Sequence, residues 1–131
     1  MRTIKFRGRD FAGFWYIGDL VHNNNEDDDL LIRRGCVSTY IENETVGQFT
    51  GLVDKNGKEI YEGDIVLSKL KRARKYDERL VICFDDFEWQ GKNANGSTTS
   101  LSLLVEYHTI EVIGNIHDNP ELLKGGIYED N

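Results

Sequence analysis

The first residues of the chain alternate between apolar and polar side chains. Ile4 and Phe6 alternate with basic residues, which is the two-residue period of a half-buried strand. The aromatic segment 11–20 follows and predicts a hairpin whose turn lies near residues 10–13. Asn and acidic residues then fill positions 22–29, where they compete with regular structure and repel one another. We therefore expect an exposed loop there.

Strand-forming residues resume after this loop, and Gly35 among them indicates a turn or a bulge. Segment 46–70 is the most informative part of the chain. Its Asn56-Gly57 dipeptide is favoured by the two-residue hairpin turn in which both central residues have positive φ. We expect the strand-like residues on its two sides to pair, and Gly63 allows a further sharp bend.

The later part of the chain carries two more strand-like stretches and one helical signal. Residues 79–89 and 101–116 are rich in Val, Ile, Leu and aromatic side chains, and each stretch predicts a strand. The polar loop between them contains a second Asn-Gly pair, which suits a hairpin tip. Asn119 and Pro120 suit the start of a helix of about one to two turns. Residues 67–78 have good helix formers but little apolar stripe, so a helix and a solvated loop both stay open.

Length and composition indicate one domain without a membrane segment. A chain of 131 residues suits a single core, and its apolar runs are far too short to cross a bilayer. No apolar stretch of the secretory type follows the N-terminus, so we expect a cytoplasmic protein. Cys36 and Cys83 lack the paired spacing of a zinc or redox motif. We interpret them as buried reduced thiols, while a disulfide between them stays open.

Four acids near the Asn-Gly pair raise the question of a metal or catalytic site: Asp54, Glu59, Glu62 and Asp64. An EF-hand loop places its glycine later and ends on a bidentate Glu, so that site is excluded. A Mg²⁺ site needs fewer carboxylates and stays open. We favour a structural interpretation, in which Asp54 fixes the hairpin turn through local hydrogen bonds and Glu62-Gly63-Asp64 forms a tight corner before a strand. The structural turn residues are then Asp54, Asn56, Gly57, Gly63 and Asp64.

No other pattern predicts chemistry. His22, His108 and His117 lie in unrelated contexts, and the sequence has no nucleophile motif and no glycine-rich phosphate loop. We therefore expect a non-enzymatic protein without catalytic residues, metal or cofactor. Seven aromatic residues are expected mostly to fill the interior, because each buries a large apolar area. They are Phe11, Phe14, Trp15, Tyr16, Phe84, Phe87 and Trp89. An exposed tryptophan among them would instead indicate a peptide groove or a self-association surface.

The charge is unevenly distributed. A net charge of −7 argues against general binding to nucleic acid, because phosphates are neutralised by an excess of Lys and Arg. The basic segment, residues 69–79, nevertheless carries six basic and two acidic groups. Its cations and one aromatic ring could lie along phosphates and stack on a base. These residues are Lys69, Lys71, Arg72, Arg74, Lys75, Tyr76 and Arg79. We favour the alternative of a solvated loop that balances acids nearby or in a second subunit.

Two stretches, TGLVDKNGKEIYEGDIV at 50–66 and IEVIGNIHDNPELL at 110–123, resemble the YopX family of phage and prophage proteins. The opening IKFR and the segment GFWYIG also suit the start of that family. The resemblance runs from Ile4 to Leu123 and is loose around the acidic loop and residues 72–96. It implies a mostly-β protein with an SH3-type barrel in its C-terminal part. It brings no established activity, catalytic residue or cofactor.

Together these observations predict a mainly β protein. Several short strands joined by turns favour an antiparallel barrel or sandwich over a parallel α/β sheet. We expect one domain, 1–131, with an N-terminal β-hairpin region at 1–45. An SH3-like barrel that ends in a short helix should occupy 46–131. The expected function is that of a phage or prophage accessory protein in a bacterial host cell, which binds a protein partner or itself. The alternative is a nucleic-acid-binding factor that uses the basic segment.

Overall fold

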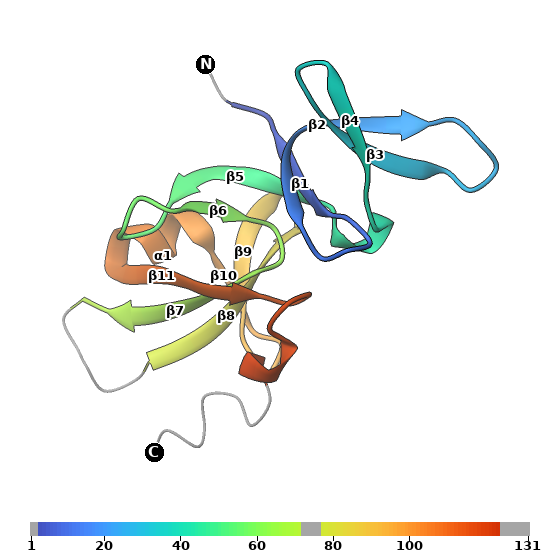
Figure 1. Cartoon of the computed structure of the whole chain (residues 1–131). Helices are drawn as coiled ribbons and strands as arrows, with labels where there is room; N and C mark the ends of the chain where they lie inside the picture. The colour runs from blue at the N-terminus through green and yellow to red at the C-terminus, as the bar shows by residue number, and fades with distance from the viewer. Residues whose placement is uncertain (1–2, 72–76, 124–131) are drawn as a thin grey trace. The chain divides into compact units, whose positions relative to one another are not determined.

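The structure is a computed structural model that describes residues 3–71 and 77–123. The chain forms two compact units, Met1–Gly51 and Leu52–Asn131, which are called unit 1 and unit 2 below. Both are built from antiparallel strands, as Figure 1 shows. The mainly β fold class expected from the sequence is therefore confirmed.

Unit 1 is an antiparallel sheet whose first four strands form a meander. Its elements are β1 (Phe6–Arg9), β2 (Trp15–Asn23), β3 (Asp29–Arg34), β4 (Val37–Tyr40), the 3-10 helix η1 (Asn43–Thr45) and β5 (Gly47–Val53), which runs on into unit 2. The strands follow the order β4-β3-β2-β1-β5. Ile32, Ile41 and Thr45 are buried, and Gly8 is a glycine because a Cβ there would clash with Ile41. The predicted N-terminal hairpin is β1–β2, in which Phe6 pairs with Gly18.

Unit 2 contains the larger apolar core. Its elements are β6 (Glu59–Tyr61), β7 (Asp64–Leu70), β8 (Asp77–Asp85), β9 (Glu88–Lys92), β10 (Thr98–Ser100), α1 (Leu101–Tyr107), β11 (His108–Asn115) and the 3-10 helix η2 (Pro120–Leu123). The sheet has the order β10-β9-β8-β7-β11, and β6 pairs with the end of β5. The buried core residues are Ile60, Val66, Leu80, Ile82, Leu101, Leu104 and Ile110.

The core of unit 2 differs from the sequence-based expectation. The residues of its core cluster are aliphatic, whereas five of the seven aromatic residues expected inside the protein, counted over both units, are exposed. These five are Phe11, Phe14, Tyr16, Phe84 and Phe87. The sheet is open, with β10 and β11 as its outer strands among the described residues, so the SH3-like barrel is not confirmed. Aliphatic side chains are large enough to fill this core, because α1 covers part of the sheet. Gly91 has no side chain, so Leu104 and Leu80 approach the sheet closely there.

Two stretches were each predicted to be a single strand, and the structure divides both of them into two elements. Residues 79–89 form the hairpin β8–β9, because the chain turns at Asp86 and Phe87. Residues 101–116 divide into α1 and β11. The helix forms because Leu101 and Leu104, one turn apart, both enter the core, and this apolar period of three residues outweighs the strand-like composition.

Two loop predictions are also corrected. His22 and Asn23 belong to β2, so the acidic loop covers only 24–28. Residues 67–78 were expected to form a helix or a solvated loop. Their described parts are mostly strand, because β7 continues to Leu70 and β8 begins at Asp77. The turn expected at Gly35, the hairpin tip at the second Asn-Gly pair and a short helix from Pro120, which is a 3-10 helix, are confirmed.

Candidate functional site: turns, the β8–β9 tip and a lysine pocket

The turn between β5 and β6 is organised by Asp54. The Asp54 N–H donates to Lys58 O at 2.8 Å, and Gly57 N–H donates to Asp54 O at 3.0 Å. The carboxylate oxygen Oδ1 accepts the Asn56 and Lys58 N–H groups at 2.8 and 2.9 Å. The other oxygen, Oδ2, accepts the Val112 N–H of β11 at 2.9 Å. These contacts are those that a structural turn requires, since backbone donors occupy both oxygens.

The turn is longer than the sequence predicted. Gly57 has a φ of +83°, but Asn56 does not have positive φ, so the two-residue turn is wrong. The loop spans 54–58, because the Asp54 side chain stabilises a wider turn that needs a single left-handed residue. Burial raises the pKa of Asp54, but the backbone N–H groups and the charge of Lys58 outweigh it and hold the pKa below its usual value. The carboxylate is therefore ionised at neutral pH.

The corner at Gly63 and Asp64 lies directly before β7. Gly63 has a φ of +90°, and its N–H and C=O bond to Ile82 O and Ile116 N. Tyr61 N–H donates to the buried carboxylate of Asp64 at 2.7 Å. The predicted corner is thus present, and its carboxylate again receives a backbone donor.

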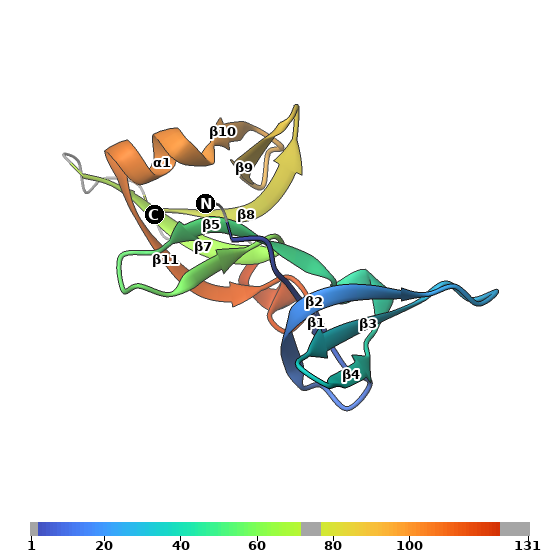
Figure 2. The same cartoon turned by 90° about the horizontal axis from the view of Figure 1, so that it is seen from above.

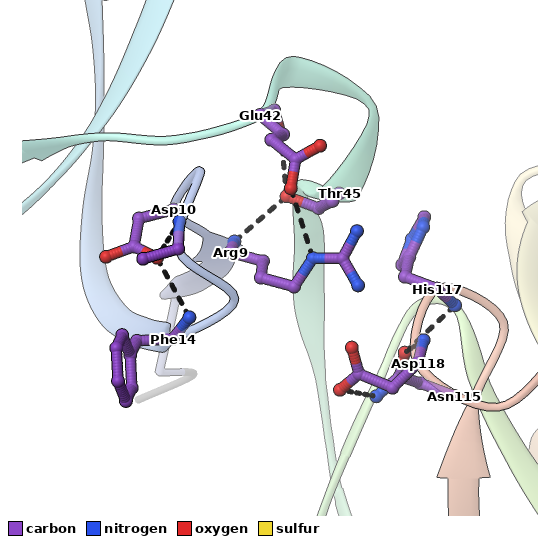
Figure 3. Close-up of polar contacts among 9 residues, drawn as sticks. Arg9, Asp10, Phe14, Glu42, Thr45, Asn115, His117 and Asp118 are labelled. Carbon is purple, nitrogen blue, oxygen red and sulfur yellow. Dashed lines mark hydrogen bonds and ion pairs between the residues drawn. The ribbon is translucent and has the colours of Figure 1, made fainter.

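The turn of β1–β2 repeats the Asp54 arrangement in unit 1. Asp10 N–H donates to Phe14 O at 2.9 Å, and Asp10 Oδ1 accepts the Ala12 and Phe14 N–H groups at 2.9 and 2.8 Å. Figure 3 shows the Phe14 contact, and beside it the bonds of Arg9 to Glu42 and Thr45. The Phe14 N–H is the main group that lowers the pKa of Asp10.

A further side chain of this kind, Asn115, follows β11. Its Oδ1 accepts the N–H groups of His117 and Asp118 at 3.0 and 2.9 Å, as Figure 3 shows. Asn119 directly precedes the following 3-10 helix, as the sequence suggested, and its carbonyl accepts the Leu122 N–H at 3.0 Å. The Asn119 Oδ1 accepts the Asn115 N–H at 3.2 Å. Both amides therefore shape the loop that follows β11.

The described members of the basic segment are engaged inside unit 2. Lys71 Nζ donates to the Glu106 carbonyl at 2.8 Å, and Arg79 donates to the Leu122 carbonyl at 2.8 Å. Lys69 forms an ion pair with Asp77 at 3.8 Å. Arg72, Arg74, Lys75 and Tyr76 lie outside the described residues. The nucleic-acid hypothesis therefore stays a prediction.

The β8–β9 tip, residues 84–89, carries the most exposed aromatic ring among the described residues of unit 2. Phe87 is 98% exposed, and it has a φ of +64° next to Asp86 at +50°. Phe84 and Trp89 face each other across the hairpin, with ring centroids 5.0 Å apart in an edge arrangement. Figure 2 shows the yellow hairpin end standing away from β7 and β11. Asp85, Asp86 and Glu88 surround the rings with negative charge.

A shallow pocket lies at the opposite end of β7. It has a volume of about 340 Å³ and is called the lysine pocket. Its lining residues are Val53, Asp54, Lys55, Lys71, Val105, His108, Thr109 and Ile110. Lys55 pairs with Glu111 at 3.5 Å, and His108 Nδ1 bonds to Ser68 Oγ at 2.9 Å. The pocket therefore combines apolar side chains with lysines in its lining.

The remaining candidates are dispersed. Cys36 is exposed, which corrects its interpretation as a buried thiol, and Cys83 is partly buried; both are free. Burial is the main cause that raises the pKa of Cys83. His22 lies 3.5 Å from Asp28. Within residues 3–71 and 77–123, no group of three His, Cys, Asp or Glu side chains could hold a metal ion. No helix in the described ranges is long and apolar enough to span a membrane.

Comparison with known proteins identifies the family. The model of the YopX protein family matches residues 6–124. The chain belongs to the YopX family. The crystal structure of protein yopX from Bacillus subtilis is similar, with a TM-score of 0.61, 22% identity and coverage of 94% of this chain and 97% of that one. A protein from Enterococcus faecalis is similar with a TM-score of 0.57, 24% identity and coverage of 94% and 99%. A comparison with curated proteins finds no match.

The family assignment confirms the resemblance found in the sequence, and the two crystal structures show the same fold. Sequence reasoning missed the β8–β9 tip and the lysine pocket. A signal for the tip exists, because Asp85 and Asp86 interrupt an apolar run and Asp tolerates the left-handed conformation. No comparable signal marks the pocket, whose residues come from four separate segments.

Proposed function

We propose that this YopX-family chain is a non-enzymatic interaction module that binds another protein chain through the β8–β9 tip. A single observation carries the proposal: Phe87 is fully exposed in a backbone conformation that an aromatic residue adopts only at a cost of about 1–2 kcal/mol. Asn or Gly would form this turn with less strain. A strained, exposed aromatic ring is what a contact residue provides, since buried aromatic anchors contribute strongly to binding.

The neighbouring side chains support the same function. Phe84 and Trp89 continue the apolar face of the hairpin beyond the core, and their edge contact holds both rings in place. A ring at the end of a two-stranded hairpin can enter a pocket on a partner without any change in the sheet. The setting that we propose is a phage or prophage gene product in the cytoplasm of a bacterial host, as the family resemblance implies.

The proposal is tested by placing a photo-reactive phenylalanine analogue at position 87 and irradiating bacterial cells that produce the protein. We expect a covalent adduct with a protein, identified by mass spectrometry. The matched control carries the analogue at Tyr40, an exposed aromatic position of β4 in unit 1. If position 87 gives no more adduct than position 40, the β8–β9 tip is not a contact site and the proposal is wrong.

A titration separates this function from nucleic-acid binding. We expect the purified chain to bind neither single- nor double-stranded oligonucleotides at roughly 50 mM salt. Binding that weakens steeply as salt rises, and that is lost on Lys69→Glu with Lys71→Glu, would favour the basic segment as the functional site.

A further inference from the structure

We propose that the β8–β9 tip of one copy docks into the lysine pocket of a second copy. This inference rests on the proposed function and names the chain itself as the partner. It would make the protein self-associate by a contact between two different surfaces, which are both parts of unit 2.

Shape supports the contact. The lysine pocket has a volume of about 340 Å³, which is enough for a phenyl ring, and Val53, Val105 and Ile110 give it an apolar lining. Phe87 does not fill the pocket of its own chain, because 98% of its surface is exposed. One molecule therefore carries both an exposed aromatic ring and an apolar pocket.

Charge supports the same pairing. Asp85, Asp86 and Glu88 place three carboxylates around Phe87, whereas Lys55 and Lys71 line the pocket. The bond of Lys71 to a backbone carbonyl leaves its positive charge without a carboxylate in that contact. Opposite charges around an apolar contact orient two surfaces and disfavour the reverse orientation.

Two carboxylates near the pocket do not oppose this arrangement. Asp54 lies in the lining, but it is only 7% exposed and backbone N–H groups occupy both of its oxygens. Glu111 pairs with Lys55 at 3.5 Å, and both side chains are about two-fifths exposed. Such an exposed pair contributes little, so Lys55 can exchange it for a carboxylate of the tip.

The positions of the two surfaces make the contact intermolecular. At the pocket end of the sheet Lys69 pairs with Asp77, and from there β8 runs for nine residues to Asp85 at the tip. Nine strand residues span about 30 Å, so Phe87 cannot reach the pocket of its own chain without unfolding the hairpin. A second copy can supply the missing partner surface.

The experiment is sedimentation velocity of the purified chain at concentrations from roughly 10 µM to 1 mM. This range covers the dissociation constants expected for a contact with one central side chain. The tip variant is Phe87→Asn, which keeps the turn because Asn tolerates positive φ. The pocket variant is Lys55→Glu with Lys71→Glu. The control for its altered net charge is Arg33→Glu with Lys92→Glu, which changes neither surface. Circular dichroism checks that all variants fold.

We expect the unchanged chain and the charge control to associate, and each of the tip and pocket variants alone to be monomeric. A mixture of the tip and pocket variants restores association, because each provides the surface that the other lacks. Raising the salt to roughly 0.5 M should weaken association several-fold. A mixture that stays monomeric, or a tip variant that associates like the unchanged chain, overturns the inference.

The two proposals fail in different ways. If the unchanged chain is monomeric throughout, while the analogue at position 87 forms adducts with a different protein, the self-association inference is wrong and the interaction function stands. If position 87 forms no specific adduct with any protein, including the chain itself, both are wrong.

Discussion

The turns at Asp10 and Asp54 have the same local structure but different roles. Each begins with Asp, reaches a glycine of positive φ three residues later, and uses Oδ1 to accept two backbone N–H groups. The Asp10 turn is exposed, and Oδ2 of Asp10 accepts the Tyr16 hydroxyl at 3.1 Å. Oδ2 of Asp54 instead bonds to Val112, 58 positions along the chain. One local pattern thus makes a surface turn in unit 1 and joins two segments of the core region in unit 2.

A third turn shows that the local part needs no charge. Asn93 N–H donates to Ser97 O, and Asn93 Oδ1 accepts the N–H groups of Asn95 and Ser97 at 3.0 Å each. Gly96 again has positive φ. A neutral amide oxygen therefore forms the same loop. The bond to β11 needs the second acceptor oxygen of the Asp54 carboxylate, which meets the Val112 N–H and which an amide lacks.

The largest effect is expected from Asp54→Ala, which should lower the free energy of unfolding of unit 2 by about 3 kcal/mol. It removes the partner of the Val112 N–H and both local acceptor contacts. Urea unfolding measures the loss, and Trp15 and Trp89 give each unit its own fluorescent reporter. Asp10→Ala is the matched change and should have a clearly smaller effect, because water replaces the lost acceptor at the surface. Equal effects would contradict the comparison.

Asp54→Asn tests the bond to the Val112 N–H separately and should lower the free energy of unfolding of unit 2 by about 2 kcal/mol. The amide keeps the local turn, as Asn93 shows, but its NH₂ group would then face the Val112 N–H. The control Asp10→Asn keeps its turn and should leave unfolding nearly unchanged. A result in which Asp54→Asn is as stable as the unchanged chain would show that the bond to β11 contributes nothing.

Gly57→Ala and Gly13→Ala should each lower the free energy of unfolding by about 1 kcal/mol, because both glycines have positive φ. A Cβ would meet open space at either position, so no clash adds to this backbone strain. The two losses are expected to be equal, since they arise from the backbone alone. Thermal unfolding of each variant provides the measurement. A much larger loss for Gly57→Ala would mean that the two loops differ locally and not only in their long-range contacts.

The smallest effect is a pH dependence. The pKa of Asp54 lies below its ordinary value in the folded chain, so its ionised form stabilises unit 2 at neutral pH. This contribution is fully present above the ordinary Asp pKa and is lost as the pH falls through the lowered folded-state pKa. Comparing urea midpoints of the unchanged chain and Asp54→Asn between neutral pH and pH of about 2 should show the smaller acid sensitivity in the variant.

Local patterns in the sequence predicted several elements well. Alternation predicted the β1–β2 hairpin, Asn-Gly pairs located two hairpin turns, and Pro120 marked the start of a short helix. The predictions failed where the residue composition of a segment favoured one structure and its tertiary contacts favoured another. The Leu-rich segment before β11 reads as strand, but packing of Leu101 and Leu104 makes it a helix. The aromatic residues were expected inside, yet aliphatic side chains already fill the core of unit 2.

The candidate site was the least predictable part. The sequence correctly marked Asp54 and Gly63 as residues of bends, since turn chemistry acts over a few neighbouring residues. It did not mark Phe87, because the strain and exposure of this residue depend on where β8 ends and β9 begins. The lysine pocket likewise exists only where the β5–β6 turn, the end of β7, α1 and β11 meet.

The sequence by itself determined the family, the mainly β fold class and the places where the chain turns, because these depend on long motifs and on residue neighbours. Only the tertiary structure decided which turn joins distant strands, which apolar side chains are buried and which aromatic rings are exposed. Those outcomes depend on contacts between residues far apart in sequence, and such contacts leave no local pattern.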